Sequence, residues 1–219
     1  MPSWKIHKIV CEKLLGSYEQ EVDEIIDSYI FHDSSRYDIE SLAKITSYIE
    51  SKYGINGLKQ FIMHHYLDRI SDIVVHYEVS KRSYPVGKVL SPKMMDIDPN
   101  NILNVLIHPF EYLEQIAREM YPGKSKRKKR TEVIGRLYRT HQELPKYPEL
   151  KRLQPLILEV RNLMKSNIEF ILKLIYKDER TQKRIEQALK MKQLAPKILA
   201  IYHEVKLEYI KKLAEKSRK

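Results

Sequence analysis

Apolar residues recur at intervals of three and four along most of this chain, and this spacing constrains the fold more than any other feature. Residues at these intervals share one face of a helix, so each stripe predicts a helix that buries one side. Two of the clearest stripes are Val22, Ile25, Ile26 and Ile30, and then Leu58, Phe61, Ile62, Ile70, Ile73 and Val74. Only 6 of the 219 residues are glycine, so few positions interrupt the pattern. The sequence predicts an all-α fold.

Caps, glycines and prolines indicate where the helices begin and end. Ser17 and Gln20 match a capping box, Gly54 closes one helix, and Pro109 bends another. A long loop is expected over residues 80–98, where prolines and a glycine replace the helical period. The expected helices cover residues 3–15, 17–31, 38–54, 56–79, 99–121, 131–142, 149–176 and 178–215, the last kinked at Pro196.

The two halves of the chain differ in charge. Residues 1–122 hold 13 basic and 18 acidic residues, a net charge of −5, whereas residues 123–219 hold 27 and 11, a net charge of +16. We therefore expect a helical domain over 1–122, a basic linker or loop over 123–130 and a basic helical extension over 131–219. The basic half attracts phosphate-rich partners, and nucleic acid is expected to bind through it and through Lys124–Arg130. A charged surface typical of heat-adapted proteins is the alternative explanation.

The expected compartment and oligomeric state depend on hydropathy, the N-terminal residues and the cysteine count. No apolar run approaches the ~20 residues that cross a bilayer, so no membrane span is expected. The opening residues lead into an amphipathic segment, not into the apolar core of a secretory signal. Cys11 is the single cysteine, which rules out an intramolecular disulfide framework. We expect a cytoplasmic protein, and a homodimer if the last two helices pack on a second copy and not on the first domain.

Histidines and aspartates gather in the first 80 residues. The set comprises His7, His32, Asp33, His64, His65, Asp68 and Asp72. Imidazole and carboxylate ligands suit a divalent ion such as zinc, manganese, iron or nickel. His64 and Asp68 are four residues apart, so they stack on one helix face. Trp4, His7 and Cys11 share one side of the first helix, which predicts that His7 faces inward.

In this order the set resembles the HD-domain metal-dependent phosphohydrolases, which have an early-helix histidine, an adjacent His-Asp pair, further histidines and a final helical aspartate. The resemblance covers roughly residues 4–80 and implies an HD-like helical bundle. It implies a divalent metal bound by His7, His32, Asp33 and Asp68, with His64 and His65 available for a second metal. Asp72 is the alternative to Asp68 as the final ligand. Trp4, with a histidine four residues before an aspartate, also gives a partial likeness to zinc-dependent phospholipases C.

The HD-domain resemblance implies an enzyme that hydrolyses a phosphoester with water as the nucleophile. Asp33 and Arg36 are the expected catalytic residues, and Arg36 would hold a substrate phosphate. Asp27 or Asp72 could orient a ligating imidazole. The basic half favours a nucleotide or nucleic acid as the phosphate-containing substrate. The alternative is a non-catalytic helical protein that binds nucleic acid or mediates assembly, and whose histidines are structural.

Overall fold

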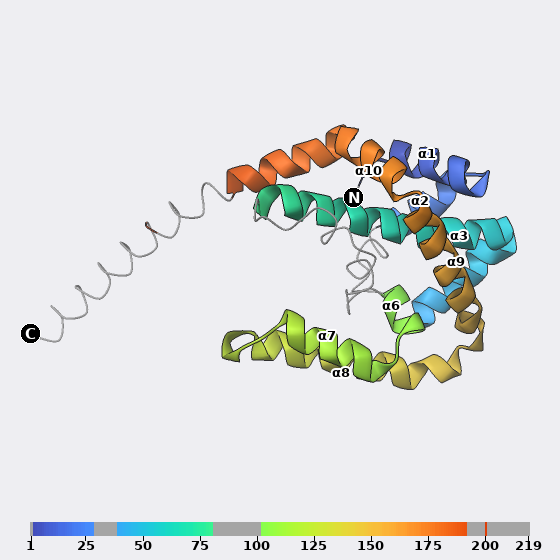
Figure 1. The fold of residues 1–219 in the computed structure, drawn as a ribbon. Coiled ribbons are helices and arrows are strands. Elements are labelled where there is room, and N and C mark those ends of the chain that lie inside the picture. Colours follow the sequence, from blue (N-terminus) through green and yellow to red (C-terminus); the bar gives the residue numbers. More distant parts are fainter. Residues whose placement is uncertain (1, 29–38, 81–101, 192–199, 201–219) are drawn as a thin grey trace, which may run out of the picture.

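The computed structural model describes residues 2–28, 39–80, 102–191 and 200, and every regular element within these residues is a helix (Figure 1). The α-helices are α1 Trp4–Leu15, α2 Gln20–Asp27, α3 Ile39–Ser80, α6 Ile102–Ile107, α7 Phe110–Met120, α8 Arg127–Glu143, α9 Leu153–Ser166 and α10 Ile168–Lys177. Residues 179–191 are helical as well. Short 3-10 turns are η1 Lys124–Lys126, η2 Leu144–Lys146 and η3 Pro148–Arg152. The prediction of an all-α fold is confirmed for the described residues, and the loop expected over 80–98 lies almost wholly outside them.

The start of α2 differs from the capping box expected at Ser17. The helix begins at Gln20, with Glu19 as the residue before it in extended conformation. The side chain of Gln60 holds Glu19 there, because its Oε1 accepts from the Glu19 N–H at 2.8 Å and its Nε2 donates to the Glu19 carbonyl at 2.7 Å. A tertiary contact from α3 therefore replaces the local cap.

A sharp break divides α3 at Gly54, as the sequence predicts. Gly54 has φ 62° and ψ −157°, a backbone conformation that residues with a Cβ rarely adopt. Three residues later the second half of the helix passes so close to the first that a Cβ on Gly57 would lie 2.5 Å from the Cβ of Tyr53. The break turns the chain so that both halves of α3 contribute to one core.

Adding one methyl group at Gly57 should therefore destabilise the protein. We expect Gly57→Ala to lower the free energy of unfolding by about 1–3 kcal/mol, because the backbone at Tyr53 must move to make room. Gly135→Ala is the matched control: Gly135 lies exposed in α8 with nothing within 4 Å of an added Cβ, so alanine should stabilise by about 0.5–1 kcal/mol. Urea unfolding of the two variants checks both signs, and equal effects would contradict the proposed close approach.

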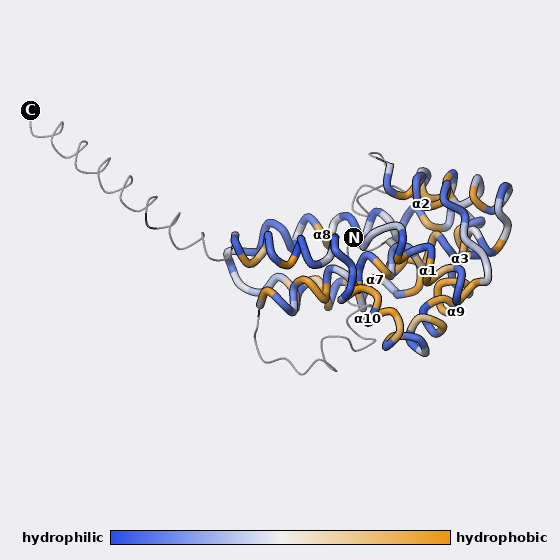
Figure 2. The backbone as a smooth tube through the Cα atoms, turned by 90° about the horizontal axis from the view of Figure 1, so that it is seen from above, coloured by the Kyte–Doolittle hydropathy of each residue, from blue (hydrophilic) through white to orange (hydrophobic). Residues whose placement is uncertain are grey.

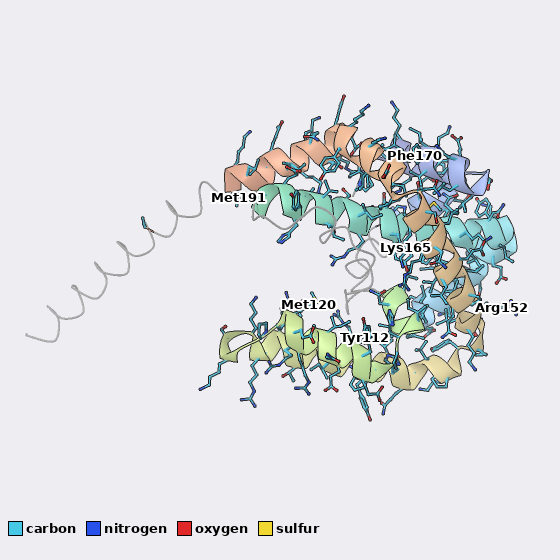
Figure 3. The ribbon with its side chains drawn as sticks, in the orientation of Figure 1. Tyr112, Met120, Arg152, Lys165, Phe170 and Met191 are labelled. Atoms are coloured by element: carbon cyan, nitrogen blue, oxygen red, sulfur yellow. The ribbon has the colours of Figure 1, made fainter. Side chains whose placement is uncertain are left out.

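The main core lies between α3 and α9 and extends to α1, α2, α6 and α10. Its fully buried members include Phe61, Ile62, Tyr66 and Leu67 of α3, Ile157, Val160 and Met164 of α9, and Ile171 and Ile175 of α10. Figure 2 shows that α9 and α10 are rich in apolar positions. At the start of α10, Phe170 packs beneath Lys13 of α1, whose Nζ lies 3.9 Å from the ring centroid (Figure 3). Core residues thus come from both sides of residues 123–130.

A second, smaller core joins α6, α7 and α8. In Figure 1, α7 and α8 form an antiparallel pair that is set apart from α3. The single bent helix expected over 99–121 is two helices, because Pro109 has no N–H to continue the ladder and instead precedes α7 as its N-cap. The basic run expected to be a linker or loop forms η1 and then the first turn of α8.

A buried polar cluster ties the beginning of the chain to the helix at residues 179–191. Asp178 caps this helix: its Oδ2 accepts from the Thr181 N–H and hydroxyl, each at 3.0 Å. Its Oδ1 accepts from the Ser3 hydroxyl at 2.5 Å. Thr181 in turn contacts Ser71 of α3 at 3.3 Å between the two hydroxyl oxygens. Asp178 therefore holds Ser3, the residue before α1, in place.

We expect Asp178→Ala to destabilise the protein by about 0.5–2 kcal/mol at pH 7, the usual effect of removing an N-cap. Burial alone would raise the pKa of Asp178, but the bonds from Ser3 and Thr181 hold it below its ordinary value. Its charged form therefore adds stability above about pH 4, and this part is lost as the pH falls through the lowered pKa. Denaturant unfolding of wild type and Asp178→Asn from pH 7 to pH 3 checks this. A stability gap that stays constant over this range would contradict it.

Candidate metal centre

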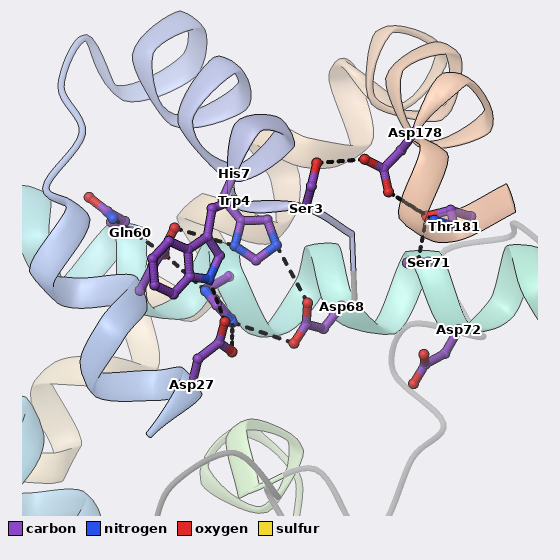
Figure 4. Close-up of polar contacts among 12 residues, drawn as sticks. Ser3, Trp4, His7, Asp27, Gln60, Asp68, Ser71, Asp72, Asp178 and Thr181 are labelled. Carbon is purple, nitrogen blue, oxygen red and sulfur yellow. Dashed lines mark hydrogen bonds and ion pairs between the residues drawn. The ribbon is translucent and has the colours of Figure 1, made fainter. Parts of the chain in front are cut away.

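Three helices bring five histidine and aspartate side chains together. His7 comes from α1, Asp23 and Asp27 come from α2, and His64 and Asp68 come from the second half of α3. The two residues of each pair on α2 and α3 are four apart, so both of them point from one helix face toward the same space. Figure 4 shows this space between α1, α2 and α3, with His7, Asp27 and Asp68 converging on it. The inward orientation predicted for His7 is confirmed, because its side chain is buried.

Asp23 lies on one side of both imidazoles. Its Oδ1 is 2.9 Å from Nδ1 of His64, and its Oδ2 is 3.4 Å from Nδ1 of His7. The carboxylate is fully buried, and its Oδ2 also accepts a hydrogen bond from the Tyr18 hydroxyl at 2.8 Å. Because Asp23 lies on the Nδ1 side of both rings, their Nε2 atoms face the opposite side.

The Nε2 atoms face two further carboxylates. His7 Nε2 is 3.4 Å from Asp68 Oδ1, and His64 Nε2 is 3.4 Å from Asp68 Oδ2 and from Asp27 Oδ1. Ligand atoms of His7, His64 and Asp68 all lie within 4.8 Å of one another. These three residues form a group that could hold a metal ion.

Four buried atoms on the Nε2 side of the rings have no hydrogen-bond partner among the described residues, and His7 Nδ1, on the side of Asp23, has none either. The four are His7 Nε2, His64 Nε2, Asp27 Oδ1 and Asp68 Oδ1. Buried polar atoms in folded proteins are almost always hydrogen-bonded, and a charged N–H···O bond is commonly 2.7–2.9 Å long. The 3.4 Å separations here are too long for that. The atoms of His7, His64 and Asp68 gather around one point, and Asp27 Oδ1 adjoins this group through His64 Nε2.

Neighbouring side chains fix the orientation of Asp27. The indole Nε1 of Trp4 donates to Asp27 Oδ2 at 2.5 Å, which leaves Oδ1 directed at His64. Trp4 lies one turn before His7 on α1. The sequence pattern that placed Trp4 and His7 on one side therefore has a physical basis, because both side chains contact the aspartates of this cluster.

The charges of the cluster depend strongly on each other. Burial alone would lower the pKa of His64, but Asp23, Asp27 and Asp68 outweigh it and raise that pKa well above its ordinary value. Burial alone would raise the pKa values of Asp23 and Asp68, but the two imidazoles hold both well below their usual range. Burial alone would also raise the pKa of Asp27, but His64 and Trp4 lower it, so all three carboxylates stay charged at neutral pH. Such a site needs positive charge, from an imidazolium or from a cation.

Other residues of the sequence-predicted set lie differently. His65 is buried next to the cluster, with its ring centroid 4.9 Å from that of Phe61, and burial followed by the nearby His64 lowers its pKa to about 3. It is not in the group whose ligand atoms lie within 4.8 Å. Asp72, the alternative final ligand, is half exposed and pairs with Arg184 at 2.7 Å.

Some expected site residues fall in the segments that the structure does not describe. His32, Asp33 and Arg36 lie within residues 29–38, outside the described residues. The described part of the predicted metal set is thus His7, His64, His65 and Asp68. Asp27, expected as an orienting residue, faces the same point as these ligands through its Oδ1.

Sequence reasoning missed Asp23, although it has the most central position. The sequence contained a usable signal: Asp23 and Asp27 stand four apart, next to the buried stripe of Val22 and Ile26 on the same helix. From the sequence alone, two carboxylates on one face of a short amphipathic helix cannot be distinguished from carboxylates on a solvent-exposed face. Only the packing of α2 against α1 and α3 makes Asp23 a buried residue.

Comparisons with known proteins add no further information about this site. No protein-family model matches the chain, and neither the curated proteins nor the solved structures include a match. Within the described residues, no helix is long and apolar enough to cross a membrane. The described residues therefore identify the protein only as an all-α protein with a candidate His/Asp metal centre.

Proposed function

We propose that His7, His64, Asp68 and Asp27 bind one divalent metal ion. The observation that supports this most directly is that each of the four residues has a buried ligand atom without a hydrogen-bond partner among the described residues, and that ligand atoms of His7, His64 and Asp68 lie within 4.8 Å of one another. Two histidines and two carboxylates are ligands that zinc, manganese, iron and nickel accept. Asp27 is the added ligand here, since Trp4 holds its second oxygen and directs the first one at His64.

The separations between these atoms suit a small divalent ion. Nitrogen and oxygen ligands lie about 2.0–2.2 Å from zinc, and two ligands of a tetrahedral ion at that distance are about 3.4 Å apart. Three of the measured separations are 3.4 Å: His7 to Asp68, His64 to Asp68 and His64 to Asp27. The charge also fits, because a divalent cation offsets two of the three negative charges of Asp23, Asp27 and Asp68.

Asp23 acts on the metal ligands without reaching the metal itself. Metal-binding histidines commonly donate their other ring N–H to a carboxylate, which fixes the tautomer and makes the ligating nitrogen more basic. Asp23 accepts from Nδ1 of His64 and lies within ion-pair distance of Nδ1 of His7. A single buried carboxylate therefore orients both imidazoles toward the same point.

We propose that the reaction class is metal-dependent phosphoester hydrolysis. A bound divalent ion supplies Lewis acidity, which polarises a phosphoryl oxygen and lowers the pKa of a water molecule. The chain's own part is to hold two imidazoles and three carboxylates at fixed positions, with His7, Asp23 and His64 buried and the other two carboxylates half-buried. The order of His7, His32-Asp33, His64 and Asp68 supports an HD-like arrangement, in which Asp33 and Arg36 are the proposed catalytic residues and a nucleotide or nucleic acid is the proposed substrate.

Metal content of the purified full-length protein tests the centre. We expect about one transition-metal ion per chain in wild type, measured by elemental analysis, and an HD-like arrangement further predicts its loss in His32→Ala and Asp33→Ala. Wild type that takes up none of zinc, manganese, iron or nickel would exclude the metal centre. Metal retained in both variants would leave the centre of α1, α2 and α3 intact and exclude the HD-like ligand set.

Hydrolysis of bis(p-nitrophenyl) phosphate and p-nitrophenyl phosphate by the metal-loaded protein tests the reaction class. Release of nitrophenol that stops on chelation and returns with the metal supports a phosphohydrolase. A protein that binds its metal but hydrolyses neither these esters nor a panel of nucleotides would make the metal structural. The histidines would then serve stability, as in the alternative of a non-catalytic binding or assembly protein.

A further inference from the structure

A basic groove runs along α8, on the smaller α7–α8 layer. Its volume is about 820 Å³, and its cationic lining residues are Lys124, Arg127, Lys128 and Arg139. A single carboxylate, that of Glu132, opposes these four positive charges. We call this feature the α8 groove.

Residue spacing explains why the α8 groove has this shape. Positions 124, 128, 131, 135 and 139 are three or four apart, so they form one stripe, and position 127 adjoins it because it lies four residues before 131. Small residues, Thr131 and Gly135, occupy the middle of the stripe between the cations. A Cβ added to Gly135 would meet nothing within 4 Å, so the centre of the groove is open.

The cations of the run Lys124–Arg130 serve two different purposes. Arg130 donates to the Tyr121 carbonyl at 3.2 Å, and Lys129 Nζ lies 5.1 Å from the centroid of the Tyr121 ring, so these two hold the turn before α8. Lys124, Arg127 and Lys128 line the groove and form no ion pair within the described part of the chain, and the same holds for Arg139. Their charge is available to a partner.

The cations at the start of α8 lie where they destabilise the helix. The first turn of α8 contains no acidic residue, and its first four residues are Arg127, Lys128, Lys129 and Arg130. The N-terminal end of a helix carries partial positive charge and favours Asp or Glu, so four adjacent cations there oppose both the helix dipole and one another. A local conflict of this kind is expected where a residue is retained for function.

We propose that the α8 groove binds the phosphodiester backbone of duplex nucleic acid. Arg127 and Arg139 are twelve residues apart, about 18 Å along the helix, which matches about five base pairs of one strand. No aromatic side chain is among the lining residues, so the groove has no surface for stacking unpaired bases. It also has no large apolar side chain to insert between lipids. Contacts to phosphates alone give binding that does not depend on base sequence.

Fluorescence anisotropy with a labelled 20-base-pair DNA duplex of mixed sequence tests this proposal on the full chain. The groove variant is K124Q/R127Q/K128Q, and the charge-matched control is K151Q/K183Q/K190Q, three exposed lysines of the basic half outside the groove. We expect wild type to bind with a steep salt dependence. The groove variant should bind more than about 10-fold more weakly and reduce the slope of log K against log salt by about two to three. The control should bind almost as tightly as wild type.

Gly135→Glu provides an independent variant that removes no cation. A carboxylate in the open centre of the groove should weaken DNA binding through repulsion of phosphates, whereas Gly135→Ala should not. Circular dichroism confirms that each variant stays helical. Equal losses in the groove variant and the control would show diffuse charge attraction and overturn the proposal. So would binding to phosphatidylserine vesicles without binding to the duplex, or no binding of either in 50 mM salt.

Discussion

Replacing His64 with alanine is expected to abolish metal binding. His64 contributes Nε2 to the cluster and contacts Asp27 and Asp68 at 3.4 Å each, so its removal opens the side of the site that those carboxylates share. Loss of a partner that only orients a ligand already lowers affinity by about 10–100-fold, so loss of a ligand should lower it by more than about 100-fold. Elemental analysis should find about one ion per chain in wild type and almost none in the variant.

Thermal unfolding provides a second readout of the same change. At a free-ion concentration about 100 times Kd, binding stabilises the folded state by about 2.7 kcal/mol, a rise in Tm of about 5–10 °C for a chain of this size. This rise should disappear in His64→Ala and in Asp68→Asn, a change of nearly equal shape at a partly exposed position. His76→Ala is the control, because His76 is exposed on the same helix. A His64→Ala protein that keeps its ion would refute the proposed ligand set.

Replacing Asp23 with asparagine is expected to weaken metal binding by about 10–100-fold while leaving a site that can still be filled. The amide keeps the size of the carboxylate but loses its charge, so it holds the two Nδ1 atoms less firmly and makes both imidazoles less basic. Isothermal titration with zinc measures the change in Kd.

Glu21→Gln is a suitable control for Asp23→Asn, because Glu21 lies on the same helix but pairs at the surface with Lys52 and Tyr53. Its Kd for zinc should equal that of wild type. Complete loss of metal in Asp23→Asn would indicate that Asp23 is itself a ligand. An unchanged Kd would show that it serves only the folding of α2.

Several helix positions were predictable because they depend on local chemistry, but the single helix expected over 149–176 was wrong, since η3, α9 and α10 replace it with a break at Asn167. The break in α3 follows from Gly54, whose positive φ strains any residue with a Cβ. The separation of α6 from α7 follows from Pro109, which has no N–H, although the sequence indicated a bend and not two helices. The start of α2 was wrong by three residues, since Gln60, 41 positions away, binds Glu19 and replaces the local cap.

The candidate site was predictable only where its residues repeat along one helix. The four-residue spacing of His64 and Asp68 indicated a pair of ligands, and the side shared by Trp4 and His7 indicated an inward histidine. The choice between Asp68 and Asp72 needed the tertiary structure, because both continue the same face of α3. Arg184, from residues 179–191, pairs with Asp72 and leaves Asp68 with the histidines.

The sequence by itself determined that this protein is helical, where some of its helices begin and end, and which of its halves is basic. These properties depend on residues within one or two turns of each other, or on composition alone. The tertiary structure decided that Asp23 lies between two imidazoles, and that the cations of residues 124–130 divide between Tyr121 and an open groove. The physical reason is that burial and charge pairing depend on which helix faces meet, and helical periodicity specifies a face but not its partner.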